Sequence, residues 1–169
     1  MRIGVISDTH GYLDPKVFGH FQSCDEIWHA GDIGAGSVAD ELEKFKPLRA
    51  VFGNIDDQSI QTRFAEDLRF DCEGLTVWIT HIGGTPPYYN PRVKKLLIAN
   101  TPHIFICGHS HILQVKRDVH LNNLLFLNPG AAGNHGFHPI KTMLRFEISN
   151  KEVRKMEAIE LGKRGQLTN

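Results

Sequence analysis

Short apolar runs alternate with amphipathic stretches over the first third of the chain. Runs of strand length with β-branched residues occur at residues 2–7, 26–29 and 48–52, and they are typical of buried strands. Between them, apolar side chains recur at helical spacing from Asp14-Pro15 onward and over residues 37–45. Strands and helices that alternate over short connections predict a parallel sheet with helices on its faces.

The remaining two thirds are richer in strands. One helix is expected at residues 92–100 and one more buried strand at 104–107. Three further pairs of runs, separated by turn residues, predict antiparallel pairs: 68–72 with 75–80, 113–117 with 124–127, and 142–148 with 152–159. We therefore expect one α/β domain over residues 1–160, followed by a polar, frayed tail over residues 161–169.

Composition excludes several classes of protein. The 169 residues are 41% hydrophobic and 22% charged, which is typical of a soluble globular protein. Basic and acidic residues balance at 19 each, so there is no strong signal for binding a nucleic-acid polymer. Three cysteines without a C-x-x-C pair indicate neither a disulfide framework nor a thiolate zinc site. No membrane span or signal peptide is visible, and we expect a cytoplasmic protein.

Polar side chains follow each of the first three strands. Asp8 and His10 stand two residues apart after the first, Asp32 follows a glycine after the second, and Asn54 follows a glycine after the third. Because ligands gather at the carboxyl ends of parallel strands, these side chains should meet at one edge. Each has an alternative role as a helix cap or a turn residue. His29 lies inside its strand, so we interpret it as a packed residue supporting the site.

Three more histidines follow strand ends. His81 comes after the strand at 75–80, while His109 and His111 follow Gly108, which permits a sharp turn. Two imidazoles two residues apart in an extended segment point the same way, and histidine is the commonest metal ligand. The other histidines have no ligand-like context, although the last two could lie near the site: His20, His103, His120, His135 and His138.

Taken together, the blocks resemble the signature of the calcineurin-like metallophosphoesterases. Asp8-x-His10, Gly31-Asp32, Gly53-Asn54, His81 and Gly108-His109-x-His111 occur in the order of that signature. The resemblance extends from Met1 to about Ile148. The short length and the turn Asn128-Pro129-Gly130 resemble the small phosphodiesterase branch, which includes relatives of the retromer subunit called vacuolar protein sorting 29.

The resemblance implies a four-layer α/β/β/α sandwich that binds two divalent transition-metal ions. It assigns Asp8, His10, Asp32 and His111 to the first ion, and a shared Asp32 with Asn54, His81 and His109 to the second. Mixed nitrogen and oxygen ligands without thiolate favour manganese, with iron, nickel, cobalt or zinc as alternatives. Asp32, Asn54 and His81 are the predicted catalytic residues.

Seven side chains supply eight bonds because Asp32 is shared, so each ion receives four protein ligands. A hydroxide bridging two ions about 3.5–4 Å apart could then attack a phosphate held by both. The predicted function is therefore hydrolysis of phosphodiester bonds, with phosphomonoesters as a second substrate class. The expected partner is a small phosphate-ester substrate, and no binding to a membrane is expected. An oligomer is possible.

Three positions depart from the signature. Many members of the family carry a histidine directly after the asparagine, proposed to protonate the leaving group, where this chain has Ile55. The acid is then water, Asp56 or another histidine. Glycine stands at residues 83–84, where many members have a further histidine, and Ala131 stands where serine is common.

Two rival functions follow from the same residues. One is a non-catalytic interaction scaffold resembling the retromer subunit, whose relatives lose or replace ligands that this chain keeps. The other is a protein with a purely structural metal, but closed structural sites favour cysteine ligands and full coordination.

Overall fold

The computed structural model describes residues 1–165. Four helices lie at Lys16–Phe21 (α1), Gly36–Phe45 (α2), Gln58–Arg63 (α3) and Pro91–Ala99 (α4). Twelve strands lie at Arg2–Ile6 (β1), Glu26–Ala30 (β2), Leu48–Val51 (β3), Asp67–Cys72 (β4), Leu75–Thr80 (β5), Gly84–Thr85 (β6), Tyr88–Tyr89 (β7), Ile104–Ile106 (β8), Leu113–Asp118 (β9), Leu124–Pro129 (β10), Ile140–Ser149 (β11) and Glu152–Lys163 (β12). None of the described helices has the length and apolarity needed to cross a membrane.

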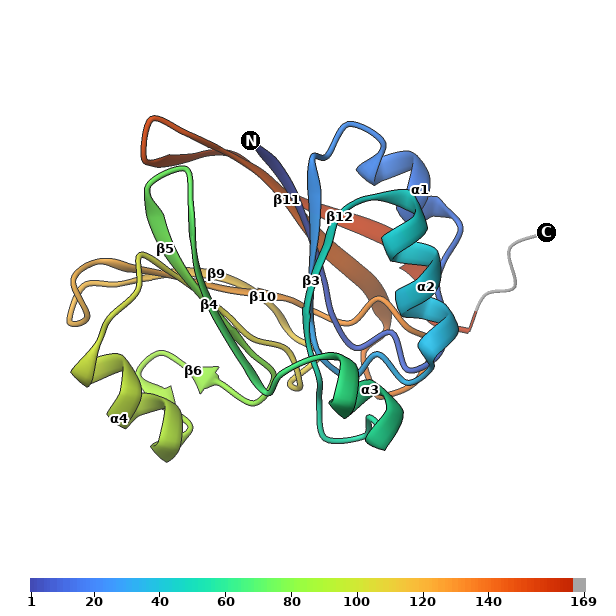
Figure 1. Ribbon diagram of the computed structural model, residues 1–169, viewed down its shortest axis with the longest axis horizontal. Helices are drawn as coiled ribbons and strands as arrows, with labels where there is room; N and C mark the ends of the chain where they lie inside the picture. Colours follow the sequence, from blue (N-terminus) through green and yellow to red (C-terminus); the bar gives the residue numbers. More distant parts are fainter. Residues whose placement is uncertain (166–169) are drawn as a thin grey trace.

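Ten of the strands in the described residues form two five-stranded sheets, and β6 and β7 pair with each other. The first has the order β12-β11-β1-β2-β3, in which β1, β2 and β3 are parallel and β11 is antiparallel to β1. The second has the order β4-β5-β8-β10-β9, in which β5, β8 and β10 are parallel. Figure 1 shows the two sheets side by side, with α1 and α2 beyond one and α4 beyond the other. This is the predicted α/β/β/α order of layers.

Three apolar clusters hold these layers together. The central one lies between the sheets and includes Val5 and Trp28 of the first with Ile79 and Ile106 of the second. Another packs α1 and α2 on the outer face of the first sheet, and the third packs α4 on the outer face of the second. Strands buried on both faces explain why the parallel strands are continuous apolar runs rather than alternating ones.

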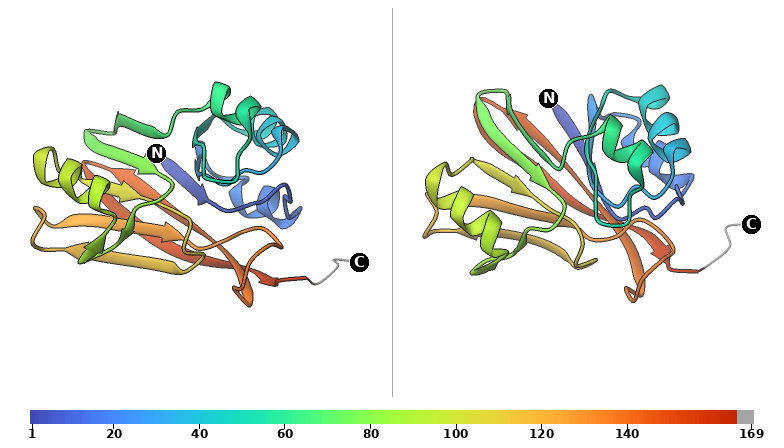
Figure 2. Two further views of the ribbon diagram at one scale, coloured as in Figure 1. Left: turned by 90° about the horizontal axis from the view of Figure 1, so that it is seen from below. Right: turned by 60° about the horizontal axis from the view of Figure 1, so that its bottom comes forward.

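The carboxyl ends of the parallel strands in both sheets meet at one rim. Asp8 N, just after β1, donates to Gly31 O after β2, and Gly108 N, after β8, donates to His81 O after β5, both at 3.0 Å. Figure 2 shows α1, α2 and α3 gathered on one side of the sheets and α4 on the other. The N–H of His109, after β8, donates to Asp8 Oδ2 at 3.1 Å, so the loops at this rim come from both sheets.

Two sequence predictions need correction. Strand β12 continues through Lys163 and its Leu161 is buried, so residues 161–163 belong to the sheet and not to a tail. Residues 166–169 of the predicted tail lie outside the described residues. Helix α3 was not predicted from the sequence. Asp57 accepts hydrogen bonds from the N–H groups of Ser59 and Ile60 and caps this helix.

Candidate metal centre

Five of the predicted ligands have left-handed backbone conformations. The φ angles are 54° at Asp8, 48° at His10, 54° at Asp32, 67° at His109 and 58° at His111. Aspartate and histidine enter this region less readily than glycine, and such residues cost about 1–3 kcal/mol each and cluster at functional sites. The rim loops thus hold these side chains in place at the expense of backbone strain.

The first group of potential ligands consists of Asp8, His10 and His111. Ligand atoms of these three residues all lie within 4.8 Å of one another. Asp8 Oδ1 is 3.1 Å from His111 Nε2 and 3.9 Å from His10 Nε2. The side chains come from loops after β1 and β8, which belong to different sheets. The absence of a side chain at Gly108 permits this approach, since a Cβ there would collide with Asp8 and Ser7.

The second group consists of Asp32, His81 and His109, whose ligand atoms also lie within 4.8 Å of one another. Asp32 Oδ1 is 3.2 Å from His81 Nε2, while Asp32 Oδ2 is 3.8 Å from His10 Nε2 in the first group. One carboxylate oxygen therefore faces each group. This is the arrangement that a shared ligand between two ions requires.

Two buried polar atoms have no hydrogen-bond partner among the described residues: Asp8 Oδ1 and His81 Nε2. His81 Nδ1 lies 2.8 Å from Ala30 O, which can only accept, so Nδ1 carries the proton and a neutral ring has its lone pair at Nε2. That lone pair lies 4.0 Å from Asp8 Oδ1. A lone pair and carboxylate oxygens buried together require a cation between them. The residues therefore fit a metal.

A second fixed ring supports the first group. His138 Nε2 lies 3.0 Å from Gly133 O and must donate to it, so His138 Nδ1 accepts from His111 Nδ1 at 3.2 Å. Burial lowers the pKa of His138, which favours the neutral ring that this bond needs. His111 Nε2 is then left as a lone pair facing Asp8. Orientation of a ligating histidine through its other nitrogen is typical of metal sites.

The charges at the rim stabilise one another. Burial works against ionisation of Asp32, but His81 and other groups lower its pKa below the usual value. Burial also works against protonation of His81, yet the carboxylates of Asp32 and Asp8 raise its pKa. At neutral pH the buried Asp32 carboxylate is therefore charged and attracts a positive group, either a proton or a metal ion.

Asn54, the seventh predicted ligand, is exposed. It lines a cavity of about 210 Å³ together with His81 and Gly53. The structure thus brings six of the seven predicted ligands into two groups and places Asn54 in the same cavity as one of them. Ile55, at the position where many family members carry a histidine, is 46% exposed, and its N–H donates to Asp32 Oδ1 at 3.1 Å.

Two polar side chains, Asp56 and Asn128, hold the rim loops in position. Asp56 accepts from the N–H groups of Ile33, Gly34 and Gly53 and thereby ties two loops together. These bonds occupy its carboxylate, which argues against Asp56 as a proton donor. Asn128 donates to Gly108 O and accepts from Gly130 N.

His29, interpreted from the sequence as a packed supporting residue, is buried. Its Nδ1 accepts from Gly31 N and its Nε2 donates to Thr9 Oγ1, whose hydroxyl donates to Ile33 O. The ring therefore links the loops after β1 and β2. Burial lowers its pKa to about 4.

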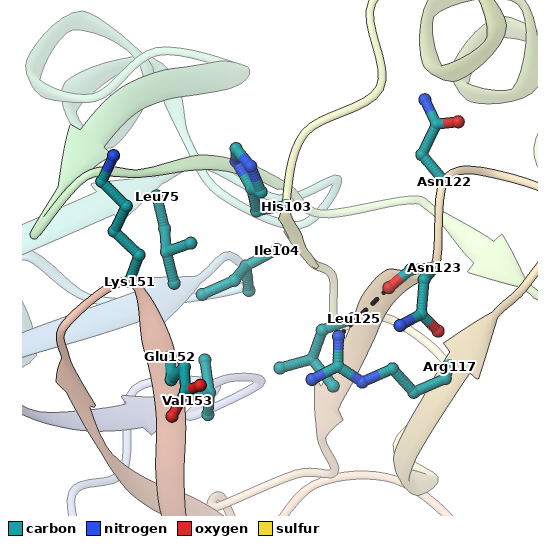
Figure 3. A pocket seen from close by; sticks show the side chains of 10 residues that line it. All are labelled: Leu75, His103, Ile104, Arg117, Asn122, Asn123, Leu125, Lys151, Glu152 and Val153. Atoms are coloured by element: carbon teal, nitrogen blue, oxygen red, sulfur yellow. Dashed lines mark hydrogen bonds between the residues drawn. The ribbon is translucent and has the colours of Figure 1, made fainter.

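Two larger cavities lie at different ends of the molecule. One of about 640 Å³ is lined by His10 and by residues 134–137, so it opens beside the candidate metal centre. The other, of about 400 Å³, lies at the amino ends of β5, β8 and β10 and is lined by Leu75, His103, Arg117 and Lys151 among others. Figure 3 shows that its polar side chains come from hairpin turns and strand ends, and no predicted ligand is among them.

Comparisons with known proteins give the family that this chain is similar to. The family model described as a calcineurin-like phosphoesterase superfamily domain matches residues 1–151. A probable metallophosphoesterase from Methanothermobacter thermautotrophicus is 31% identical over 137 residues, which cover 78% of this chain and 77% of that protein.

Solved structures share the fold. An archaeal phosphodiesterase, described as novel, superposes with a TM-score of 0.75 and 22% identity, covering 95% of this chain and all of that one. A single mutant of Vps29 from Entamoeba histolytica gives a TM-score of 0.72 and 19% identity, covering 96% of this chain and all of that one. At these identities the likeness concerns the fold alone.

Proposed function

Because the chain belongs to the calcineurin-like phosphoesterase superfamily, we propose that it is a hydrolase of phosphodiester bonds that depends on two divalent metal ions. The observation that supports this most directly is the pair of buried atoms without partners, Asp8 Oδ1 and His81 Nε2. They face each other across a rim that contains two groups of ligands. A bound cation would offset the cost of burying these polar atoms without partners.

In this proposal Asp8, His10 and His111 hold the first ion, and His81, His109 and Asn54 hold the second, with Asp32 shared between them. Bound ions would supply an activated water and neutralise the charge of the phosphate. The protein's own part is to fix these ligands. His138 and Ala30 O hold two imidazoles in the tautomer with a free Nε2, and Asp56 holds the loops.

Manganese is the first choice among the metals, with iron, nickel, cobalt or zinc as alternatives, because imidazole and carboxylate ligands without thiolate suit these ions. Phosphomonoesters are the second substrate class. A phosphate group is small enough to be bound through the ions alone, so the metals by themselves do not discriminate between the two classes.

The alternative is a non-catalytic interaction scaffold on the same fold, which the chain shares with Vps29. The six converging ligands and their strained backbone argue against it, since a scaffold has no need of either. We favour the enzyme for this reason.

The test combines metal analysis with turnover. Purified protein is loaded with each candidate metal and assayed on bis(p-nitrophenyl) phosphate and p-nitrophenyl phosphate. We expect metal-dependent hydrolysis of the diester and its loss in Asp8→Asn. Asp71→Asn, an exposed carboxylate on β4, is the matched control and should behave as wild type. Absence of hydrolysis with every metal would favour the scaffold.

A further inference from the structure

The cavity beside the candidate metal centre has an exposed aromatic wall. Phe137 is 74% exposed, and its ring stacks on that of His111 at 5.7 Å between centroids and 13° between planes. One face of Phe137 therefore rests on a predicted ligand, while the other faces away from it. The exposed face of the ring is available for stacking against a planar group.

The loop that carries Phe137 is fixed by backbone contacts. His138 donates to Gly133 O, while Arg164 donates from its N to Pro139 O and from its Nε to His138 O. Asn134 accepts from the N–H of Gly165 at 3.4 Å. The two residues that follow β12 thus hold both ends of the loop, so the position of the Phe137 ring does not depend on its own contacts alone.

Glycine at position 136 allows the loop to lie flat against the centre. Its φ is +115°, and a Cβ there would collide with Nδ1 and Cε1 of His111. The close approach brings Phe137 onto the face of His111, and the cavity that Phe137 lines also includes Tyr12 and Arg164. A planar group entering this cavity meets an aromatic face, a guanidinium and a phenol.

We propose that this cavity is a subsite for the organic group of the substrate and that Phe137 selects a planar aromatic group by stacking. The proposal rests on the proposed function, because it places the phosphate at the metal ligands. The group could be a nucleobase or a simple aryl ring, which share this chemistry. The balanced net charge of the chain favours a small ester over a nucleic-acid polymer.

The test measures binding of phosphonates, whose carbon–phosphorus bond is not an ester, to the manganese-loaded protein. Methylphosphonate reports the metal centre alone, phenylphosphonate adds an aromatic ring, and thymidine 5′-phosphonate adds a nucleoside. We expect both aromatic probes to bind about tenfold more tightly than methylphosphonate, the lower end of what stacking supplies. Tighter binding of the thymidine probe would identify a nucleoside; equal binding would identify a simple aryl group.

Variants of Phe137 distinguish the effect of its aromatic ring from the effect of its size. Phe137→Leu should abolish the tenfold preference while methylphosphonate affinity and metal content stay unchanged, and Phe137→Tyr should keep it. Ile98→Ala, an exposed apolar residue on α4, is the control and should keep it too. A preference that persists in Phe137→Leu, or is absent in wild type, overturns the subsite. Turnover of bis(p-nitrophenyl) phosphate tests the proposed function separately.

Discussion

The two ends of the sandwich use the same backbone conformation for different purposes. At the carboxyl ends of the strands, aspartate and histidine have positive φ at five positions. At the amino ends, positive φ occurs at Asn122, Asn123, Asn150 and Lys151, in the loops joining β9 to β10 and β11 to β12. Asparagine enters this region easily, so most of these turns are ordinary ones. Lys151, and Glu73 with a φ of 49° between β4 and β5, also lie in tight hairpin turns, whereas the positive φ angles at the first end fall on predicted ligands.

The hydrogen bonding of polar side chains also differs between the two ends of the sandwich. Around the cavity at the amino ends, His103 Nδ1 accepts a hydrogen bond from the N–H of Thr76. Arg117 donates to Asn123 O (Figure 3). At the carboxyl ends, Asp8 Oδ1 and His81 Nε2 have no hydrogen-bond partner within residues 1–165. One end is complete as the chain folds, whereas the other needs something from outside. Four changes test this contrast.

The largest effect is expected from Asp32→Asn. Asparagine tolerates the left-handed conformation and can still accept from the N–H of Ile55, so the free energy of unfolding of the metal-free protein should stay within about 1 kcal/mol of wild type. Loss of the shared carboxylate should lower turnover by more than about a hundredfold, beyond the effect of residues that only support ligands. Urea unfolding measures the stability, and a turnover assay with metal analysis measures the loss of activity. Full metal content with normal turnover would refute the assignment.

The next effect concerns pH and His29. The pKa of its buried ring is about 4, against 6.5 ordinarily, because burial outweighs the nearby carboxylates. Between these values the unfolded chain binds a proton that the folded chain does not, so stability falls as pH falls from about 6.5 toward 4, by up to about 3 kcal/mol. Urea unfolding of metal-free His29→Gln should show a shallower dependence on pH. An identical slope in the two proteins would contradict this.

A smaller effect is expected from His138, which only positions His111. His138→Ala should lower metal affinity and turnover by about ten- to a hundredfold. Asparagine can place its amide oxygen near the position of the accepting Nδ1, so His138→Asn should recover part of the loss. Metal titration distinguishes this role from a general loss of stability, because rescue by asparagine is not expected if the ring only fills space.

The smallest effect is expected at the other end. Residue 150 has a φ of 53°, in the left-handed region that alanine adopts less readily than asparagine. Asn150→Ala should therefore lower the free energy of unfolding by about 1 kcal/mol. Turnover and metal content should not change. A loss of activity here would mean that the two ends are not independent.

Much of this architecture could be predicted from the sequence, because strands buried on both faces leave continuous apolar runs. The rim was predictable for the same reason: polar residues after such runs must gather where parallel strands end. Helix α3 was missed because its six residues contain a single buried apolar side chain, Ile60, too little for a periodic pattern.

Residues that act through tertiary contacts left weaker signals. His138 is 27 residues from His111, and nothing in the local sequence links them. Lys141 and Asp14 form a buried ion pair 127 residues apart, which no spacing rule anticipates. The extension of β12 was missed because its outer face is charged, and only its pairing with β11 shows that Leu161 is inside.

Each ligand group draws on both sheets. In the first group, Asp8 and His10 follow a strand of one sheet and His111 follows a strand of the other. In the second group, Asp32 follows a strand of the first sheet, while His81 and His109 follow strands of the second. An ion in either group would therefore fasten the two halves of the sandwich at their open margin. Removal of the metal by a chelator would then weaken the contact between the two sheets as well as abolish the proposed hydrolysis.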